Sequence, residues 1–427
     1  MSLSQRWNEI RTGFEGPFWV ANVTEMFERL SYYAVFSSLS LYLNETLKFS
    51  AEEAGNLSGF FGGFVWFMAI FGGALADRMG FRRALALAYF ILATAYFLLG
   101  SIGSAWMAPL RLSEPPTTLV FAILALPALG VALVKPIIVG TTARSSEENV
   151  RSIGYSIYYT MVNVGSLMGP IVAGWIHERF PDEYIFRVAA VSVFLMFFAV
   201  LLFFKEPRRG EEATSLAQTV KNFGMVVTNF RFMTFLVIFS GYWIVFWQEF
   251  IILPLYVRDF IDKNANSQYI LSWGPAVVIT LTVAMNYLTR RIPALPAIAL
   301  GTLISSIAWV IVALQPTVTA AVLTVIVVAI GEIIQSPRYY EYISRLAPSG
   351  QQGTYMGFAF LPIGIGSLVA GTIGGKLYTH YGQVVKQPEM IWWWVTGIGV
   401  LTALLLWVYD KMLAPKDGND PATAKAA

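Results

Sequence analysis

The sequence predicts an all-α membrane protein with twelve transmembrane helices in two pseudo-symmetric six-helix bundles. Of its 427 residues, 56% are hydrophobic and only 13% are charged, whereas soluble domains carry roughly 25% charged residues. Apolar stretches of about 20 to 25 residues recur along the whole chain, and each is long enough to cross the ~30 Å hydrocarbon core as a helix. A polar segment near the middle separates two halves that resemble each other.

The apolar stretches define the expected spans. They cover residues 18–43, 54–76, 82–101, 118–143, 151–176, 184–204, 232–257, 267–290, 293–314, 318–344, 352–377 and 390–412. Prolines inside them, such as Pro170, Pro254 and Pro362, predict kinks. We expect no cleaved leader, because the first apolar stretch is longer than the apolar region of a signal peptide.

The polar segment "KEPRRGEEATSLAQTVKNFG" from Lys205 divides the chain. We expect residues 1–204 to form the N-terminal bundle, 205–231 a cytoplasmic linker, and 232–427 the C-terminal bundle with a short cytoplasmic tail. The stretches "GSLMGPIVAGW" from Gly165 and "GSLVAGTIGGK" from Gly366 lie about 200 residues apart, which indicates a duplicated six-helix unit. Glycines such as Gly165, Gly169 and Gly174 in the fifth span predict faces where helices pack closely.

The composition excludes several classes of protein. The chain has no cysteine and two histidines, His177 and His380, which fall at expected helix ends in different halves. We therefore expect no disulfide, no metal site and no cofactor, and no catalytic motif indicates an enzyme. The basic clusters indicate membrane topology, not nucleic-acid binding: roughly 18 Lys and Arg fall on one side and roughly eight on the other, which predicts both termini in the cytoplasm. We expect a monomeric, multi-pass protein of the cell membrane.

Five of the charged residues inside the expected spans are candidates for a function. They are Glu25, Glu28 and Arg29 in span one, Lys135 in span four, and Glu332 in span ten. A charge at the centre of a membrane helix costs on the order of 2.5–3.5 kcal/mol on insertion scales, so such residues usually have a function. These five are the predicted functional core.

The stretch "NVTEMFERLSYYA" places its charges on adjoining helix faces. Glu25 and Arg29 are separated by one turn, and Tyr32 and Tyr33 follow one turn further on. With Lys135 the set is neutral, so protonation of one glutamate leaves a surplus cation that can hold a carboxylate or another anion. The alternative is a static ion-pair cluster that fixes helix packing.

Glu332 lies at the start of the second half of span ten. The internal repeat makes span ten the counterpart of span four, so we expect Glu332 to face Lys135 across the two halves. A zwitterion with its carboxylate toward Arg29 and Lys135 and its ammonium toward Glu332 would satisfy both ends. Arg338 and Glu341, nearer the cytoplasmic end, form either a gating pair or a plain structural pair.

The turn "GGALADRMGFRR" between spans two and three resembles the G-x-x-x-D-R-x-G-R-R loop of the major facilitator superfamily. Asp77 can accept hydrogen bonds at a neighbouring helix terminus, and Arg78 can bind carbonyl ends or anionic headgroups. We interpret the pair as a latch on one conformer, with an ordinary charged turn as the alternative.

Further motifs resemble the proton-coupled oligopeptide transporters (POT) of that superfamily. Their E-x-x-E-R motif is matched by Glu25, Glu28 and Arg29, their fourth-helix lysine by Lys135 in "LVKP", and their tenth-helix glutamate by Glu332 in "GEIIQSP". The resemblance implies proton coupling at Glu25, Glu28, Arg29 and Lys135. It implies a substrate pocket lined by Arg29, Tyr32, Tyr33, Lys135, Asn163, Trp243, Gln248 and Glu332.

Two positions depart from the family pattern. A second arginine is usual where this chain has Phe36, and an acid is usual where it has Trp247. Because both members of this pair have become aromatic, we interpret them as an apolar gating contact in place of an ion pair. Glu249, directly after Gln248, either restores an acid nearby or points elsewhere on the helix.

These observations together predict a proton-coupled symporter. It would import di- or tripeptides, or a similar small zwitterionic or anionic solute, by alternating access. One alternative is a proton-linked exporter of the drug antiporter type, which the glycines and Pro170 of span five partly resemble. Another is a transporter-derived receptor that binds its ligand without moving it.

Overall fold

The computed structural model describes residues 12–207, 224–347 and 352–414, without the side chains of residues 73, 74, 77 and 352–354. Most of the expected linker and tail therefore lie outside the described residues. The described chain forms two compact units, one of Met1–Phe49 with Met68–Leu216 and one of Ser50–Phe67 with Ala217–Ala427. Each unit is described by itself below.

Each expected span in the first half of the chain corresponds to one long helix. Its helices are α2 (Gly16–Leu41), α3 (Ala51–Met79), α4 (Phe81–Leu99), α5 (Thr117–Arg144), α6 (Arg151–His177) and α7 (Glu183–Phe203), with short turns η1 (Tyr42–Thr46) and η2 (Ala105–Leu110). Each expected span agrees with its helix to within about three residues at either end.

The second half follows the same pattern with two interruptions. Its helices are α9 (Phe230–Ile251), α10 (Leu253–Tyr256), α11 (Ser267–Thr289), α12 (Ala294–Leu314), α13 (Val318–Leu346), α14 (Gln352–Phe358), α15 (Leu361–Leu377) and α16 (Met390–Met412), with π-helical turns η3 (Val257–Ile261) and η4 (Tyr378–Val385). The expected spans 232–257 and 352–377 are each divided, next to Pro254 and Pro362, because proline at a helix start cannot continue the preceding hydrogen-bond ladder.

The predicted class of all-α membrane protein is confirmed. In the described residues, ten segments are long and apolar enough to cross a membrane. The long helices α2 and α6 fall outside that group, since α2 carries the Glu25, Glu28 and Arg29 charges and α6 is rich in Ser, Tyr and Gly. The expected number of twelve spans is consistent with this arrangement.

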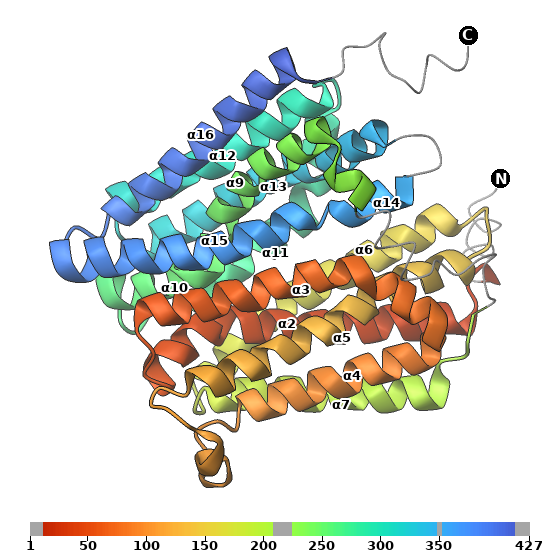
Figure 1. The fold of residues 1–427 in the computed structure, drawn as a ribbon, viewed down its shortest axis with the longest axis horizontal. Coiled ribbons are helices and arrows are strands. Elements are labelled where there is room, and N and C mark those ends of the chain that lie inside the picture. The colour runs from red at the N-terminus through yellow and green to blue at the C-terminus, as the bar shows by residue number, and fades with distance from the viewer. Residues whose placement is uncertain (1–11, 208–223, 348–351, 415–427) are drawn as a thin grey trace. The chain divides into compact units, whose positions relative to one another are not determined.

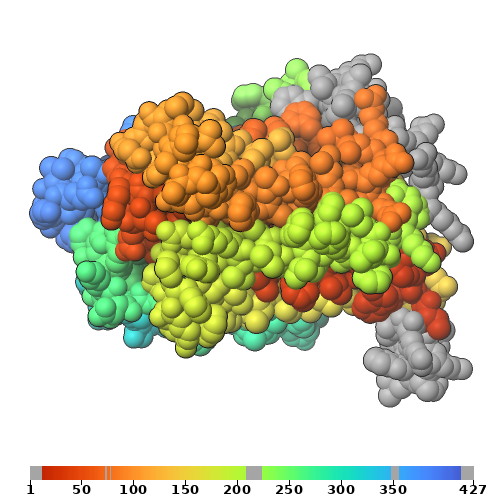
Figure 2. Space-filling view, turned by 90° about the horizontal axis from the view of Figure 1, so that it is seen from below, coloured from red at the N-terminus to blue at the C-terminus, as the bar shows by residue number. Residues whose placement is uncertain are grey.

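The first unit is built around α2. This helix packs against α5, α6 and α7, while α4 lies between α5 and α7, as Figure 1 shows for the red to yellow-green segments. Figure 2 shows α4, in orange, and α7, in yellow-green, side by side on one face. A shallow apolar groove between them is lined by Phe90, Phe97, Val191 and Phe194. Such a surface suits lipid chains.

Two glycines let α6 approach α2 at backbone distance. A Cβ on Gly165 would lie 2.4 Å from the carbonyl oxygen of Met26 and 2.8 Å from the Cβ of Arg29. One turn later, a Cβ on Gly169 would lie 2.6 Å from the carbonyl oxygen of Leu30. The glycines of span five thus form a close contact face, and they fix the part of α2 that carries the charges.

The second unit has an aromatic core. Its helix α9 packs against α15 and α16, α12 packs against α13 and α16, and α11 packs against α13. The rings of Trp309 and Trp392 stack with centroids 4.6 Å apart. The first part of α3 belongs to this unit because Gly55 and Gly59 meet the backbone of α15, where Ser367 donates a hydrogen bond to the carbonyl of Gly59 at 3.1 Å.

Candidate functional site

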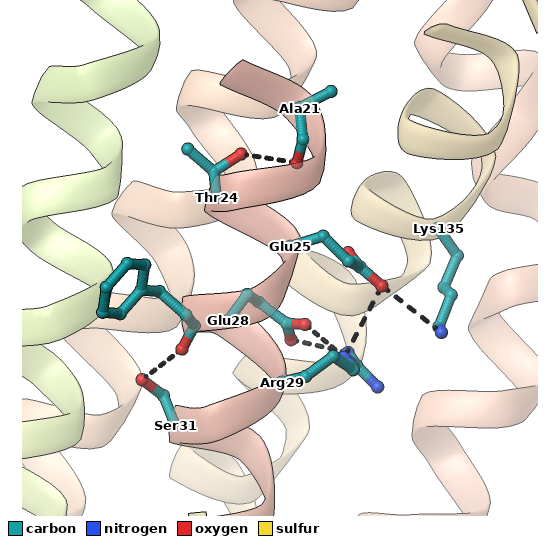
Figure 3. Close-up of polar contacts among 8 residues, drawn as sticks. Ala21, Thr24, Glu25, Glu28, Arg29, Ser31 and Lys135 are labelled. Carbon is teal, nitrogen blue, oxygen red and sulfur yellow. Dashed lines mark hydrogen bonds and ion pairs between the residues drawn. The ribbon is translucent and has the colours of Figure 1, made fainter. Parts of the chain in front are cut away.

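The charged residues of α2 are fully enclosed. Glu25 and Glu28 are 0% exposed and Arg29 is 2% exposed. One turn before Glu25, the Asn22 amide donates to the Phe18 carbonyl at 2.8 Å and to the Thr142 hydroxyl of α5 at 3.4 Å, which ties this part of α2 to α5. Figure 3 shows the carboxylates of Glu25 and Glu28 converging on Arg29, with Lys135 reaching in from α5.

Glu28 and Glu25 hold Arg29 in different ways. The guanidinium of Arg29 donates two hydrogen bonds to Glu28, through Nη2 to Oε1 at 2.6 Å and through Nε to Oε2. Glu25 Oε1 lies 3.7 Å from Arg29 Nε and 3.4 Å from Lys135 Nζ. Among the described residues, neither oxygen of Glu25 has a hydrogen-bond partner. Glu28 is therefore a bidentate partner of Arg29, and Glu25 is a buried carboxylate held only by looser ion pairs.

The four groups carry no net charge when all are ionised. Two carboxylates balance Arg29 and Lys135, and Lys135 is the most accessible member, with 17% of its side chain exposed. Loss of the Glu25 charge on protonation would leave Lys135 without its ion-pair partner. A cation left without a partner in a low-dielectric site strongly favours an incoming anion. The arrangement can therefore link proton binding to anion binding.

Aromatic rings continue this face of α2. The guanidinium carbon of Arg29 lies 4.8 Å from the centre of the Tyr32 ring, a distance suited to a cation–π contact. Tyr33 packs edge-on against Tyr32 at 5.3 Å, and Phe36, which is 1% exposed, stacks on Tyr32 at 5.9 Å. Phe36 thus extends the aromatic stack from the position where the resemblance would place a second arginine.

Asn163 lies on α6, the helix that packs against α2. Its amide donates to the carbonyl of Tyr159 on its own helix at 2.8 Å, and the side chain is exposed enough to reach solvent. A substrate group would have to compete with this local hydrogen bond. The role of Asn163 in the substrate pocket stays a prediction.

The predicted residues of α9 pack toward α15. Gln248 is fully buried and donates to the carbonyls of Ala370 at 3.1 Å and Ile244 at 3.2 Å. Trp247 Nε1 donates to the carbonyl of Ile363 at 3.2 Å. Trp243 is half-buried and lies close to Gly366 of α15. A Cβ added to Gly366 would lie 2.2 Å from the Cβ of Trp243. Their pocket and gating roles also stay predictions.

Two acids lie in the interior of the second unit. Glu332 on α13 is half-buried, and Glu249 on α9 is 3% exposed. Glu249 Oε1 lies 3.3 Å from the position that a Cβ on Gly274 of α11 would occupy. The sequence prediction left Glu249 out of the site because helix geometry points it away from the position of the family's acid, where this chain has Trp247.

Arg338 and Glu341 do form a pair. Arg338 Nη1 lies 2.8 Å from Glu341 Oε2, and Arg338 also donates to the carbonyl of Thr289 at 3.2 Å. The other carboxylate oxygen of Glu341 accepts from Arg345 at 2.6 Å. The geometry fits both the gating and the structural interpretation.

The turn between α3 and α4 uses a carboxylate that sequence reasoning missed. Arg78 is exposed, and the side chain of Asp77 lies outside the described residues. Glu206, just after α7, accepts hydrogen bonds from the backbone N–H groups of Phe81 at 2.6 Å and Arg82 at 2.9 Å, and so caps α4. The sequence contained an indication of this contact, because Glu206 at the end of span six falls on the same membrane side as the arginines of this turn.

Within the part of the chain that the structure describes, no group of three or more His, Asp or Glu side chains could hold a metal ion.

Comparisons with known proteins agree on the family and the fold. The family model described as Major Facilitator Superfamily matches residues 23–361. Among curated relatives, the Multidrug resistance protein MdtH of Klebsiella pneumoniae subsp. pneumoniae is 24% identical over 391 residues, covering 90% of this chain and 92% of that protein. MdtH of Citrobacter koseri is 23% identical over 415 residues, covering 93% and 96%.

Solved structures of POT family transporters share the fold of this chain. A POT family transporter in complex with 5-aminolevulinic acid superimposes with a TM-score of 0.77 at 17% identity, covering 93% of this chain and 96% of that one. A mutant of the peptide transporter POT in complex with alafosfalin gives a TM-score of 0.79 at 18% identity, covering 92% and 94%. The expected similarity is therefore found at the level of the fold.

Proposed function

Because this chain belongs to the major facilitator superfamily and is a multi-pass membrane transporter rather than an enzyme, we propose that it couples proton flow to solute import. The solute is a di- or tripeptide or a similar small zwitterion or anion. Import proceeds by alternating access in the cell membrane, with both termini in the cytoplasm.

One observation supports this proposal most. Glu25 is fully buried between Arg29 and Lys135, and its oxygens find no hydrogen-bond partner in the part of the chain that the structure describes. Protonation of Glu28 would break a bidentate pair, whereas protonation of Glu25 loses only two ion pairs longer than 3.3 Å. Glu25 is therefore the proposed proton carrier, and Glu28 holds Arg29 in place.

Proton binding and anion binding then favour each other. When Glu25 is protonated, the positive charges of Lys135 and Arg29 are no longer fully balanced and can attract a substrate carboxylate. A bound carboxylate in turn favours protonation of Glu25. This is the linkage that a symporter needs. If the cluster were a static set of ion pairs, anion binding would not depend on pH in this way.

A second function is favoured by the curated relatives. Both are named multidrug resistance proteins, and an exporter would exchange its solute for a proton. The structural relatives favour the symporter, since two of them were solved with 5-aminolevulinic acid and alafosfalin. Direction of transport separates the two.

Proteoliposomes test the proposal directly. With an acidic exterior, the wild-type protein is expected to accumulate labelled dialanine, and Glu25→Gln is expected to lose the dependence on the proton gradient while retaining counterflow. Glu147→Gln, which changes an exposed carboxylate before α6, serves as the matched control. Proton-driven drug efflux without inward accumulation would establish the exporter instead, and dialanine binding without movement would establish the receptor.

A further inference from the structure

The apolar groove between α4 and α7 has an arginine at one end. Val191 and Phe194 line the groove on α7, and Arg187 precedes them by one and two turns on the same helix face. On α4 the lining reaches Phe97, three residues before Gly100, whose carbonyl accepts a hydrogen bond from Arg187 Nε at 3.0 Å. Both helices therefore place Arg187 beside the end of α4, where the groove stops.

The hydrogen bond to Gly100 leaves most of this guanidinium available. Among the described residues, Nε of Arg187 makes that one bond and the two Nη groups engage no acceptor. Of the acids at this end of α7, Glu183 makes no ion pair with Arg187 in the described part of the chain, and Asp182 pairs with His177 at 2.6 Å. Arg187 thus presents free N–H donors in an orientation that its bond to the backbone fixes.

A tryptophan marks the level of the membrane at which this arginine lies. Trp106 of η2 stacks on the groove residue Phe97 with ring centroids 6.3 Å apart, and 54% of its side chain is exposed. Leu110 and Leu112, which follow it, are exposed as well. Tryptophan is enriched at the boundary between the hydrocarbon core and the headgroups. Arg187 therefore lies at the depth of lipid headgroups.

The length of the groove matches one leaflet of a bilayer. Phe90 is the groove residue of α4 farthest from Gly100, and its ring contacts Phe197 of α7 with centroids 5.8 Å apart. The helical rise from Arg187 to Phe197 is ~15 Å, which is about half of the ~30 Å hydrocarbon core. A groove of this length accommodates an acyl chain that enters from the headgroup level.

A phospholipid satisfies both parts of this surface. A guanidinium binds a phosphate through parallel, charge-assisted hydrogen bonds, and an acyl chain covers the exposed side chains of Phe97, Val191 and Phe194. A free anion would leave the groove uncovered. A second copy of the chain, packed through the same face about a twofold axis, would bring Arg187 toward its own counterpart.

We propose that Arg187 and the groove between α4 and α7, which Figure 2 shows side by side, form a binding site for one phospholipid. The phosphate lies on the Nη groups of Arg187, and one acyl chain follows the groove toward Phe90. With cytoplasmic termini, the site belongs to the outer leaflet. The site does not depend on which solute the protein moves or in which direction.

Native mass spectrometry of the purified protein tests the headgroup contact. The wild type is expected to retain a single molecule of dioleoylphosphatidylglycerol, and Arg187→Gln should weaken this binding about 10- to 100-fold. The matched control is Arg179→Gln at the same end of the bundle, since Arg179 already donates to Glu178 at 3.0 Å and to the Trp175 carbonyl at 3.2 Å. Equal binding by the wild type and Arg187→Gln would overturn the proposal.

A second variant tests the groove and leaves Arg187 in place. Val191 is 59% exposed, so Val191→Trp should fold normally while its larger side chain fills the groove. We expect it to weaken binding of the same lipid about 10-fold. Leu202→Trp, at a 71% exposed position near the other end of α7, should leave binding unchanged. Retention of the lipid by Val191→Trp at wild-type strength would contradict the proposed path of the acyl chain.

Two further ligands identify the group that is recognised. Dioleoylglycerol has the same acyl chains without the phosphate and should not be retained by the wild type. Glycerol 3-phosphate has the phosphate without the chains and should not compete with the lipid. Retention of dioleoylglycerol would show general contact with apolar chains, and effective competition by glycerol 3-phosphate would show a site for free phosphate esters. Either result would overturn the phospholipid site and leave proton coupling at Glu25 standing.

Discussion

At the scale of single residues, Arg29 has two carboxylate neighbours that contact it in different ways. Glu28 gives it two hydrogen bonds, whereas Glu25 lies 3.7 Å away. Helix spacing predicted a contact between Glu25 and Arg29, which are one turn apart. The sequence could not reveal that the short contacts go to adjacent Glu28, because the rotamer of Arg29 is set by packing against other helices.

This difference predicts unequal effects on stability. Glu28→Gln leaves Arg29 without its bidentate partner and should cost on the order of 3 kcal/mol, while Glu25→Gln should cost about 1 kcal/mol. Adding Arg29→Met to Glu28→Gln should restore part of the loss, because no orphan cation remains. Thermal unfolding of the purified variants gives the ranking, and equal losses for Glu25→Gln and Glu28→Gln would contradict it.

At the scale of elements, the fold positions the site by means of the contact between α2 and α6. Hydropathy predicted both helices to within a few residues, as for span 151–176 and α6 (Arg151–His177). It did not reveal the break between α9 and α10, although Pro254 marks it, since Pro170 lies inside continuous α6. A proline alone does not decide between a kink and a break, because neighbouring helices can satisfy the freed carbonyl.

Gly165 gives a test of this element contact. A methyl group there would meet the carbonyl of Met26 at 2.4 Å and the Cβ of Arg29 at 2.8 Å, so Gly165→Ala should push α2 away at the charged cluster. We expect a loss of about 1–3 kcal/mol together with weaker proton-driven uptake. Gly397→Ala on α16, where a Cβ would meet no described atom within 4 Å, should change neither the thermal midpoint nor the uptake rate.

At the scale of the whole molecule, the sequence predicted the fold class but not the membership of each unit. Residues Ser50–Phe67 group with the second unit although they precede the linker by more than 130 residues. Hydropathy indicates which segments enter the membrane, but it does not indicate which helices pack against each other. That choice depends on backbone contacts such as Gly371 against Gly55.

The orientation in the membrane is the remaining prediction at this scale. The excess of Lys and Arg on one side predicts cytoplasmic termini, which places Ser113 outside the cell and Glu147 inside it. Because the chain has no cysteine, Ser113→Cys and Glu147→Cys each introduce a single thiol at an exposed loop position. An impermeant maleimide should label Ser113→Cys in intact cells and Glu147→Cys only after permeabilisation. The reverse labelling would invert the topology, and Glu206 and the arginines that surround the start of α4 would then face the exterior.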